Sequence, residues 1–401
     1  MNGNRRAEFD WLRVLAFGLL IFFHAAVAFL PRGLPMIQNE ESSVALTLFV
    51  AFLHEFRLAL LFLVSGVGVS FALRRRDRTA FFANRFRRLV LPLLFGVLVV
   101  VPPMVFLEMR HLGRFAGSFL DFYPAVFTNG TYPRGYLSWH HYWFVAYLFL
   151  FCVVGWPIFA RLRDVTGSRW LQAQTARLQS SVGIYWGIVP LAVVELALRG
   201  LFPGFRDLIH DWASFTQWFL VFIAGFVLAA QPALLTRAAQ LRTRSVAAAI
   251  VTSSLLFMLL WSPELGRFDV HSDGGVSLSR YLYLCLLRAA NVWFWLMACV
   301  GYAGRYLTRS GRVLDYLNEA VYPVFCVHLT IMVALEYWIV PLDWSIAAKY
   351  LAISAGTLAA ALLLYELCLR RVAWLRPLVG LKPGRPATAP ASQAVGGASK
   401  R

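Results

Sequence analysis

Apolar runs of about 20 residues recur along this 401-residue chain, separated by short polar stretches. A helix of that length crosses the hydrocarbon core of a bilayer. Hydrophobic residues make up 59% of the chain and charged residues 14%, which is typical of a polytopic membrane protein. The pattern predicts an all-α integral membrane protein of about ten transmembrane helices, with approximate limits 11–30, 46–73, 89–108, 143–160, 181–199, 213–230, 244–262, 281–304, 319–340 and 346–369.

The distribution of basic residues predicts the topology. Twenty-six lysines and arginines lie in the loops on the side of the N-terminus, and eight lie in the opposite loops. Because basic loops are retained in the cytoplasm, we expect both termini to be cytoplasmic in a multi-pass protein of the inner (plasma) membrane. The net charge of +18 reflects this bias and contact with membrane lipids, so it does not indicate a nucleic-acid partner.

The chain is predicted to be one domain followed by a tail. Residues 1–380 should form a single transmembrane domain, since no polar linker divides them. From 381 to 401 the composition shifts to Pro, Ala, Gly and Ser, which predicts a disordered cytoplasmic tail. The five cysteines lie in apolar runs without metal-type spacing, so we expect packing residues and no bound metal.

A layer of polar residues is predicted in the outer half of the bundle. His24 follows Arg13 by almost three helical turns, so the two residues share one face and lie about 16 Å apart along the axis. His54, Glu55 and Arg57 enter the second helix at the height of His24. Charged side chains are costly inside a membrane, and function is the usual reason to keep them. Arg288 and Asn291 are expected in the same layer, with His328 near mid-depth.

His24 is the candidate catalytic base in this layer. If Glu55 bonds one ring nitrogen of His24, the other nitrogen is free to take a proton from a hydroxyl group. The alternative is that His24 only links neighbouring helices by a hydrogen bond. Glu55 and Arg57 could equally form an internal ion pair with no chemical role.

A basic cluster is predicted on the cytoplasmic side, from Arg74 to Arg88, and Arg13 should emerge beside it. Guanidinium groups bind phosphate through paired hydrogen bonds, so the cluster suits a phosphorylated donor. Topology and lipid contact explain most of these arginines. Arg85 and Arg88 are stronger candidates, because we expect them where helix 89–108 begins and its free amides favour an anion.

The outer loop 110–141 is rich in aromatic residues, Gly and Pro. It is predicted to be either a lid or half-inserted segment over a site, or an aromatic belt at the membrane interface.

Common catalytic and nucleotide-binding motifs are missing from the sequence. There is no Walker-type glycine loop, paired CxxC, GxSxG elbow or HExxH, and no internal repeat. Gly66 and Gly68 are therefore predicted to be close-packing positions in the second helix.

Several separate stretches resemble the membrane-bound acyltransferase 3 family, in the same order and over nearly the whole chain. The C-terminal stretch 375–383 further resembles a branch that contains a glucan succinyltransferase. The second helix departs from the family at residues 54–60, where relatives often carry Met-Pro. The matching stretches are Phe9–Arg13 with His24, Phe62–Gly66, Arg85–Pro92, His141–Phe144 and Asn318–His328.

The resemblance implies transfer of an acyl group from cytoplasmic acyl-CoA to a hydroxyl of an extracytoplasmic carbohydrate, such as a periplasmic glucan, with no permanently bound cofactor. It implies that His24 is catalytic, either as a base or as a carrier of the acyl group, and that Arg13, Arg85 and Arg88 bind the donor or line the site. Acetyl is the commonest acyl group of the family, and the C-terminal stretch suggests succinyl. Glu55, Arg57 and His328 are the further catalytic candidates.

Two roles are expected for the arginines of the polar layer. Arg57 or Arg288 could stabilise the oxyanion that develops during acyl transfer, or bind the carboxylate of a succinyl group.

A secondary transporter or flippase for a glycan or lipid precursor is the alternative function, with the buried charges lining its pathway. Such proteins are often built from inverted repeats with broken helices, and the sequence pattern predicts neither. Nothing in the sequence indicates an oligomeric state.

Overall fold

The computed structural model describes residues 6–31, 37–73, 77–164, 177, 183–204, 206–261 and 278–382. Throughout these residues the regular elements are helices, which confirms the predicted all-α membrane fold. In the described part of the chain, eight helices are long and apolar enough to cross a membrane: α1 (Ala7–Val27), α2 (Val44–Leu73), the continuous helix Arg78–His111, α11 (Trp212–Ala230), α12 (Pro232–Trp261), α13 (Leu278–Tyr306), α14 (Arg312–Ile339), and α15 (Ile346–Leu364) with its extension η6 (Tyr365–Leu369).

Two further apolar segments account for the remaining predicted spans. The predicted helix 143–160 is broken at Gly155, where α7 (Trp143–Val154) and α8 (Trp156–Asp164) are bent by 56°. Pro157 has no amide hydrogen to continue the helix across this point. The expectation of unbroken helices is therefore wrong here. The other segment is short and consists of η5 (Gly183–Gly187) and α10 (Ile188–Leu198).

Several helices extend beyond their predicted limits at the basic ends. α1 begins at Ala7, α12 at Pro232 and α14 at Arg312, all before the apolar run starts. Hydropathy marks the part of a helix that lies in the bilayer, whereas backbone hydrogen bonding continues outside it.

The helix Arg78–His111 contains two π-helical turns. Pro102 in this helix has no amide hydrogen to donate to the carbonyl of Leu98. The hydroxyl of Tyr123 donates to that carbonyl instead, at 3.0 Å. The local change of helical pitch thus leaves a carbonyl that the following loop can bind. The elements in order are α3 (Arg78–Arg85), η1 (Phe86–Val90), α4 (Leu91–Phe95), η2 (Gly96–Val100) and α5 (Val101–His111).

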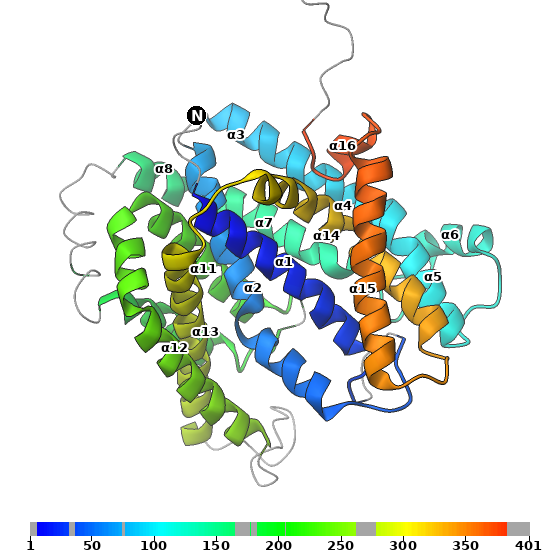
Figure 1. The fold of residues 1–401 in the computed structure, drawn as a ribbon, viewed down its shortest axis with the longest axis horizontal. Helices are drawn as coiled ribbons and strands as arrows, with labels where there is room; N and C mark the ends of the chain where they lie inside the picture. The colour runs from blue at the N-terminus through cyan, green and yellow to red at the C-terminus, as the bar shows by residue number, and fades with distance from the viewer. Residues whose placement is uncertain are drawn as a thin grey trace, which may run out of the picture.

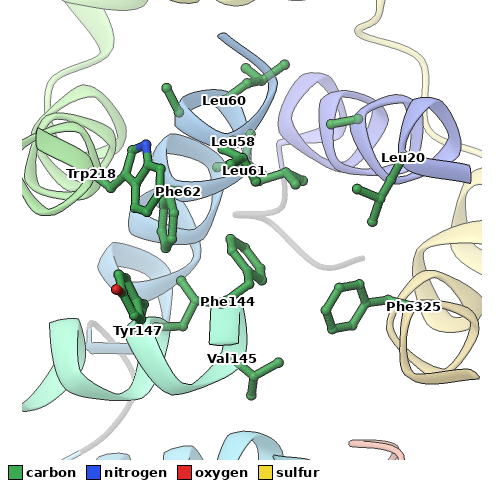
Figure 2. Packing of buried hydrophobic residues seen from close by; sticks show 14 of the residues in the cluster. Leu20, Leu58, Leu60, Leu61, Phe62, Phe144, Val145, Tyr147, Trp218 and Phe325 are labelled. Atoms are coloured by element: carbon green, nitrogen blue, oxygen red, sulfur yellow. The ribbon is translucent and has the colours of Figure 1, made fainter. Parts of the chain in front are cut away.

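α1 lies at the centre of the bundle and packs against α2, α13, α14 and α15, as Figure 1 shows. α2 also packs along α11, α12 packs along α13, and α5 packs against α14. The core contacts between these helices are aromatic and aliphatic, including Phe62 of α2, Phe144 of α7 and Phe325 of α14 (Figure 2).

Two glycines set the close approach of α2 and α11. A β-carbon at Gly66 would lie 1.9 Å from the carbonyl oxygen of Phe222, and one at Gly225 would lie 1.9 Å from that of Leu63. Neither position has room for a side chain, because the neighbouring group is backbone. Close packing at Gly66 is confirmed, and Gly68 instead lies near the side chain of Arg13.

The first and last described helices lie at the same end of the bundle. Figure 1 shows the start of α1 and the short helix α16 (Leu375–Leu378) at the top, with the α14–α15 turn at the opposite end. Trp11 donates to the carbonyl of Arg309 at 3.0 Å, which ties α1 to the segment before α14. A shared side for the two ends is consistent with the predicted topology; that this side is cytoplasmic stays a prediction.

Some predictions concern residues outside those that the structure describes. Arg74, Arg75 and Arg76 of the basic cluster and residues 383–401 of the predicted tail belong to this group. The single-domain prediction for residues 1–380 likewise stays a prediction.

Gly66→Ala is expected to destabilise the protein by about 1–3 kcal/mol or more, because the added methyl group overlaps the backbone of α11. Thermal unfolding of the purified protein in detergent measures the change. The matched control is Gly68→Ala, whose β-carbon would meet the guanidinium of Arg13 at an ordinary 3.6 Å. Equal melting temperatures for the two variants would contradict the packing assigned to Gly66.

Candidate functional site

His24 and His328 form a hydrogen-bonded pair between α1 and α14. The Nδ1 atom of His24 lies 3.1 Å from the Nε2 atom of His328. The two rings are nearly parallel, with an interplanar angle of 12° and centroids 5.3 Å apart. His328 is 1% exposed, and its Nδ1 atom lies 2.7 Å from the carbonyl oxygen of Phe325. The structure therefore brings together two histidines that the sequence predicted at different depths, His24 in the outer half and His328 near mid-depth.

The partner of His24 differs from the one expected. Sequence analysis considered Glu55 as the group that orients His24, but the hydrogen bond of His24 within the described residues goes to His328. Glu55 instead lines a cavity on the other side of α2, near Arg288. Sequence spacing indicates the depth of Glu55 in the membrane, but the rotation of α2 turns its side chain away from α1.

Arg57 lies buried beside the histidine pair. Its guanidinium carbon sits 3.4 Å from the ring centroid of Phe23, the residue before His24. The side chain is 3% exposed, and its Nε and Nη1 atoms have no hydrogen-bond partner among the described residues. The ion pair between Arg57 and Glu55 that the sequence left open is not formed, since no nitrogen of Arg57 lies within 4.0 Å of a carboxylate oxygen of Glu55. A buried guanidinium with free donors is suited to a negative charge that forms or binds next to it.

A polar cavity of about 150 Å³ opens beside this layer, between α2, α10, α11 and α13. Phe23 lies between the cavity and the histidine pair: its ring centroid is 6.3 Å from that of His54, which lines the cavity, and 5.5 Å from that of His24. The polar side chains that line the cavity are His54, Glu55, Glu195, Arg199, Arg206, Ser214, Gln217 and Arg288.

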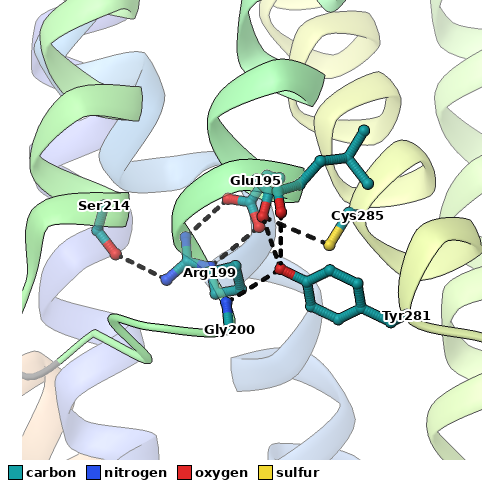
Figure 3. Close-up of polar contacts among 7 residues, drawn as sticks. Glu195, Arg199, Gly200, Ser214, Tyr281 and Cys285 are labelled. Carbon is teal, nitrogen blue, oxygen red and sulfur yellow. Dashed lines mark hydrogen bonds and ion pairs between the residues drawn. The ribbon is translucent and has the colours of Figure 1, made fainter. Parts of the chain in front are cut away.

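A buried ion pair holds one wall of the cavity, as Figure 3 shows. Arg199 donates to both carboxylate oxygens of Glu195, from Nε at 3.0 Å and from Nη2 at 2.7 Å. Its Nη1 atom donates to the hydroxyl of Ser214 at 3.0 Å, which joins α10 to α11. The hydroxyl of Tyr281, from α13, donates to the carbonyl of Glu195 at 3.2 Å. Three helices are thus fixed around the cavity by one polar network.

Arg206 enters the cavity from the loop between α10 and α11. Its backbone amide donates to Asp211 at 3.1 Å, and its guanidinium lies 5.3 Å from the ring centroid of Trp143. Burial lowers the pKa of the Arg206 guanidinium, and Asp211 opposes the shift. Sequence analysis counted Arg206 only as a basic residue of an outer loop. Basic residues are few in the loops on the side opposite the N-terminus, and this scarcity was the signal that could have pointed to Arg206.

The outer loop 110–141 reaches into the bundle at its end. His141 is 6% exposed, its ring lies 5.1 Å from that of His328, and its Nε2 atom lies 3.3 Å from the carbonyl of Cys326. The hydroxyl of Tyr142 donates to the same carbonyl at 2.8 Å. These contacts place the end of the loop inside the bundle, and the choice between a lid or half-inserted segment and an aromatic belt for the loop stays a prediction. His141 was recognised by resemblance but not chosen as a site residue.

The rest of the loop packs on α5 and α14. Its short helix α6 (Phe119–Thr128) begins with a capping box, in which Ser118 and Asp121 bond each other's backbone amides. Tyr132 donates to Glu108 at 2.7 Å, and burial, followed by the charge of Glu108, raises the pKa of the Tyr132 hydroxyl. The loop is thus tied to α5 before the segment that carries His141.

The candidate donor-binding arginines lie near the opposite end of the bundle from the cavity. Arg13 donates to Asn318 at 2.9 Å and to Asp10 at 3.2 Å, so it also links α1 to α14. Arg85 is half-buried beside Phe81, and Arg88 is exposed.

The expected position of Arg85 and Arg88 at a helix start is wrong. The helix begins at Arg78, where Asp77 accepts a hydrogen bond from the amide of Ala80 at 2.7 Å. Arg85 ends α3 two turns later, and Arg88 lies in η1. The amides around both arginines are therefore within a continuing helix, and only their side chains can bind an anion.

The histidine pair, the polar cavity and the basic end define a multi-pass membrane protein with a buried polar centre. Residues 6–366 match the family model described as an acyltransferase domain, that of acyltransferase 3. The chain belongs to this family and is an acyltransferase.

The chain is similar to glucans biosynthesis protein C of Escherichia coli strain K12, with 22% identity over 348 residues, 83% of this chain and 84% of the relative. The protein of the same name from Escherichia coli O139:H28 has the same identity and coverage. No solved structure matches the chain.

Glu195→Gln is expected to destabilise the protein by up to about 3–5 kcal/mol, because it leaves the half-buried Arg199 without the carboxylate that pairs with it. The loss is read from the melting temperature in detergent. Glu366→Gln is the control, since its ion pair with Arg370 has side chains 35% and 42% exposed, and exposed pairs contribute about 0–1 kcal/mol. A Glu195→Gln protein as stable as this control would show that the network in Figure 3 does not hold the cavity wall.

Proposed function

We propose that this protein transfers an acyl group from acyl-CoA in the cytoplasm to a hydroxyl of a carbohydrate outside the inner membrane. The observation that carries the proposal is the partly buried His24–His328 pair, with Arg13 towards the start of the same helix and a polar cavity beside the layer. Family membership supplies the reaction class, and the arginines at one end of the bundle and the polar cavity support a donor and an acceptor that approach the pair from different sides. The name of the similar bacterial protein supports a glucan as the acceptor.

The donor would bind at the basic end. Its phosphates would contact Arg13, Arg85 and Arg88, whose guanidinium groups can donate paired hydrogen bonds. α1 is helical from Ala7 to Val27, so the rise from Arg13 to His24 is about 16 Å. An extended pantetheine arm spans a distance of this order, which would bring the thioester to His24.

The reaction would use His24 either as a base or as a transient carrier of the acyl group. In the first route, His24 takes the proton of the acceptor hydroxyl while the oxygen of that hydroxyl attacks the acyl carbonyl carbon. The carbon–sulfur bond then breaks, and the thiolate receives the proton from His24. Arg57 would stabilise the oxyanion that forms in between, since two of its buried nitrogens are free to donate. His328 would contribute to the reaction from α14, where it bonds His24, and Glu55 would contribute from the cavity.

His24→Ala is expected to abolish acyl transfer while the protein stays in the membrane. Inside-out vesicles receive radiolabelled acetyl-CoA or succinyl-CoA, and label on carbohydrate is measured. His210→Ala is the control. His210 is exposed in the loop between α10 and α11, so loss of its side chain should leave transfer at the wild-type level. Full transfer by His24→Ala would remove His24 from the reaction. Movement of unmodified carbohydrate without label would favour the transporter.

The charges of the cavity support succinyl as the acyl group. Arg288 lines it and makes no hydrogen bond or ion pair within 4.0 Å among the described residues, so it is placed to bind the carboxylate of a succinyl group. Arg288→Gln should then reduce succinyl transfer about tenfold or more and leave acetyl transfer nearly unchanged, as expected for a lost charge-assisted hydrogen bond of about 1.5–3 kcal/mol. Equal losses with both donors would count against a carboxylate at Arg288.

A further inference from the structure

The protonation pattern of the histidine pair follows from one backbone carbonyl. The Nδ1 atom of His328 lies 2.7 Å from the carbonyl oxygen of Phe325, which can only accept a hydrogen bond. Nδ1 of His328 must therefore carry a proton. In neutral His328 the Nε2 atom then has a free lone pair and is an acceptor.

This acceptor fixes the tautomer of His24. The Nδ1 atom of His24 lies 3.1 Å from Nε2 of His328, so it must supply the proton of that bond. Neutral His24 then carries its only proton on Nδ1 and has a free lone pair on Nε2. A doubly protonated His328 would reverse the bond, but it would place a second positive charge in the buried layer beside Arg57.

We propose that the carbonyl of Phe325 and His328 form a relay that holds His24 with its reactive lone pair on Nε2. The inference rests on the proposed acyl transfer and assigns the reacting atom within it. His328 is then a positioning residue, which acts on the substrates only through His24.

The relay is held by the packing of its first member. The ring of Phe325 lies 5.4 Å from that of Phe17 on α1 and 6.0 Å from that of Phe144 on α7. Figure 2 shows Phe325 projecting from α14 towards Phe144 in the core. The parallel stacking of the two imidazoles, at 12°, further limits rotation of either ring. The carbonyl of Phe325, His328 and His24 therefore stay hydrogen-bonded in this sequence, although the relay contains no carboxylate.

The same atom serves both chemical routes. As a base, Nε2 takes the hydroxyl proton while the acceptor oxygen bonds the acyl carbon, and it returns that proton to the thiolate as the carbon–sulfur bond breaks. As a carrier, Nε2 bonds the acyl carbon, the thiolate leaves, and the acceptor oxygen then displaces Nε2. In both routes Nδ1 of His24 keeps its proton and donates a hydrogen bond to Nε2 of His328 throughout.

The test compares two substitutions of His328. The side-chain oxygen of Gln in His328→Gln can accept the proton of His24 Nδ1, whereas His328→Leu offers no acceptor. We expect His328→Leu to lower kcat at least 100-fold with a KM for acyl-CoA within about twofold of wild type, and His328→Gln to retain at least tenfold more activity than His328→Leu. Equal kcat losses in the two variants, or wild-type kcat in His328→Leu, would overturn the relay.

A second readout does not depend on acyl transfer. Nitrogen-15 NMR of histidine-labelled protein in membranes distinguishes a protonated from a bare ring nitrogen, and His24→Gln identifies the signals of His24. The relay predicts a protonated Nδ1 and a bare Nε2 at His24 in wild type, and a mixture of tautomers in His328→Leu. A proton on Nε2 in the wild-type protein would overturn the inference.

The two readouts separate failure of the relay from failure of the proposed function. If the wild-type protein transfers no acyl group and yet shows the predicted tautomer, the function is wrong and the relay stands. The groups that face the pair and shape the pH dependence of kcat are Arg57 from α2, His141 from η3 (His140–Tyr142) and Arg206 from the loop between α10 and α11. They are unchanged in both His328 variants, so a difference in pH profile between these variants reports on the relay.

Discussion

A polar side chain inside a membrane bundle must find its partner within the protein, because lipid offers no hydrogen bonds. The site follows this constraint through two short chains of contacts. One runs from the carbonyl of Phe325 through His328 to His24, and the other joins Glu195 to Arg199 and Ser214. Arg57 is held differently, over the ring of Phe23 with two of its nitrogens unpartnered, so its charge remains available to a developing oxyanion.

The close approach of α2 and α11 connects the packing of the bundle to this chemistry. Gly66 and Gly225 let the two backbones touch, and the same two helices carry the cavity residues Glu55 and Gln217. A side chain at either glycine would push the helices apart and widen the cavity. The ion pair of Glu195 closes the third side from α10. The width of the cavity is thus fixed by backbone contact on one side and by a buried charge pair on the other.

Sequence periodicity predicted every apolar segment, because membrane insertion requires long apolar runs whatever the tertiary packing. It did not predict the break at Gly155 or the helical turns beyond the bilayer, which depend on local backbone geometry. For the site, the sequence selected both His24 and His328, which the structure joins by a hydrogen bond, and their depth in the membrane stays a prediction. The partner of His24 was not predictable, because depth leaves helix rotation undetermined and Glu55 turns to the cavity. His141 and Arg206 lie in loops that enter the bundle only through tertiary folding.

In the proposed function, donor and acceptor reach the His24–His328 pair from opposite sides of the membrane. Purified protein in sealed proteoliposomes tests this most directly, with radiolabelled acyl-CoA added outside and glucan enclosed in the lumen. In molecules whose Arg13, Arg85 and Arg88 face the outside of the proteoliposome, label should appear on the enclosed glucan. The released CoA should remain outside and should not enter the lumen. Label confined to glucan on the same side as the acyl-CoA, or export of unlabelled glucan, would contradict the account.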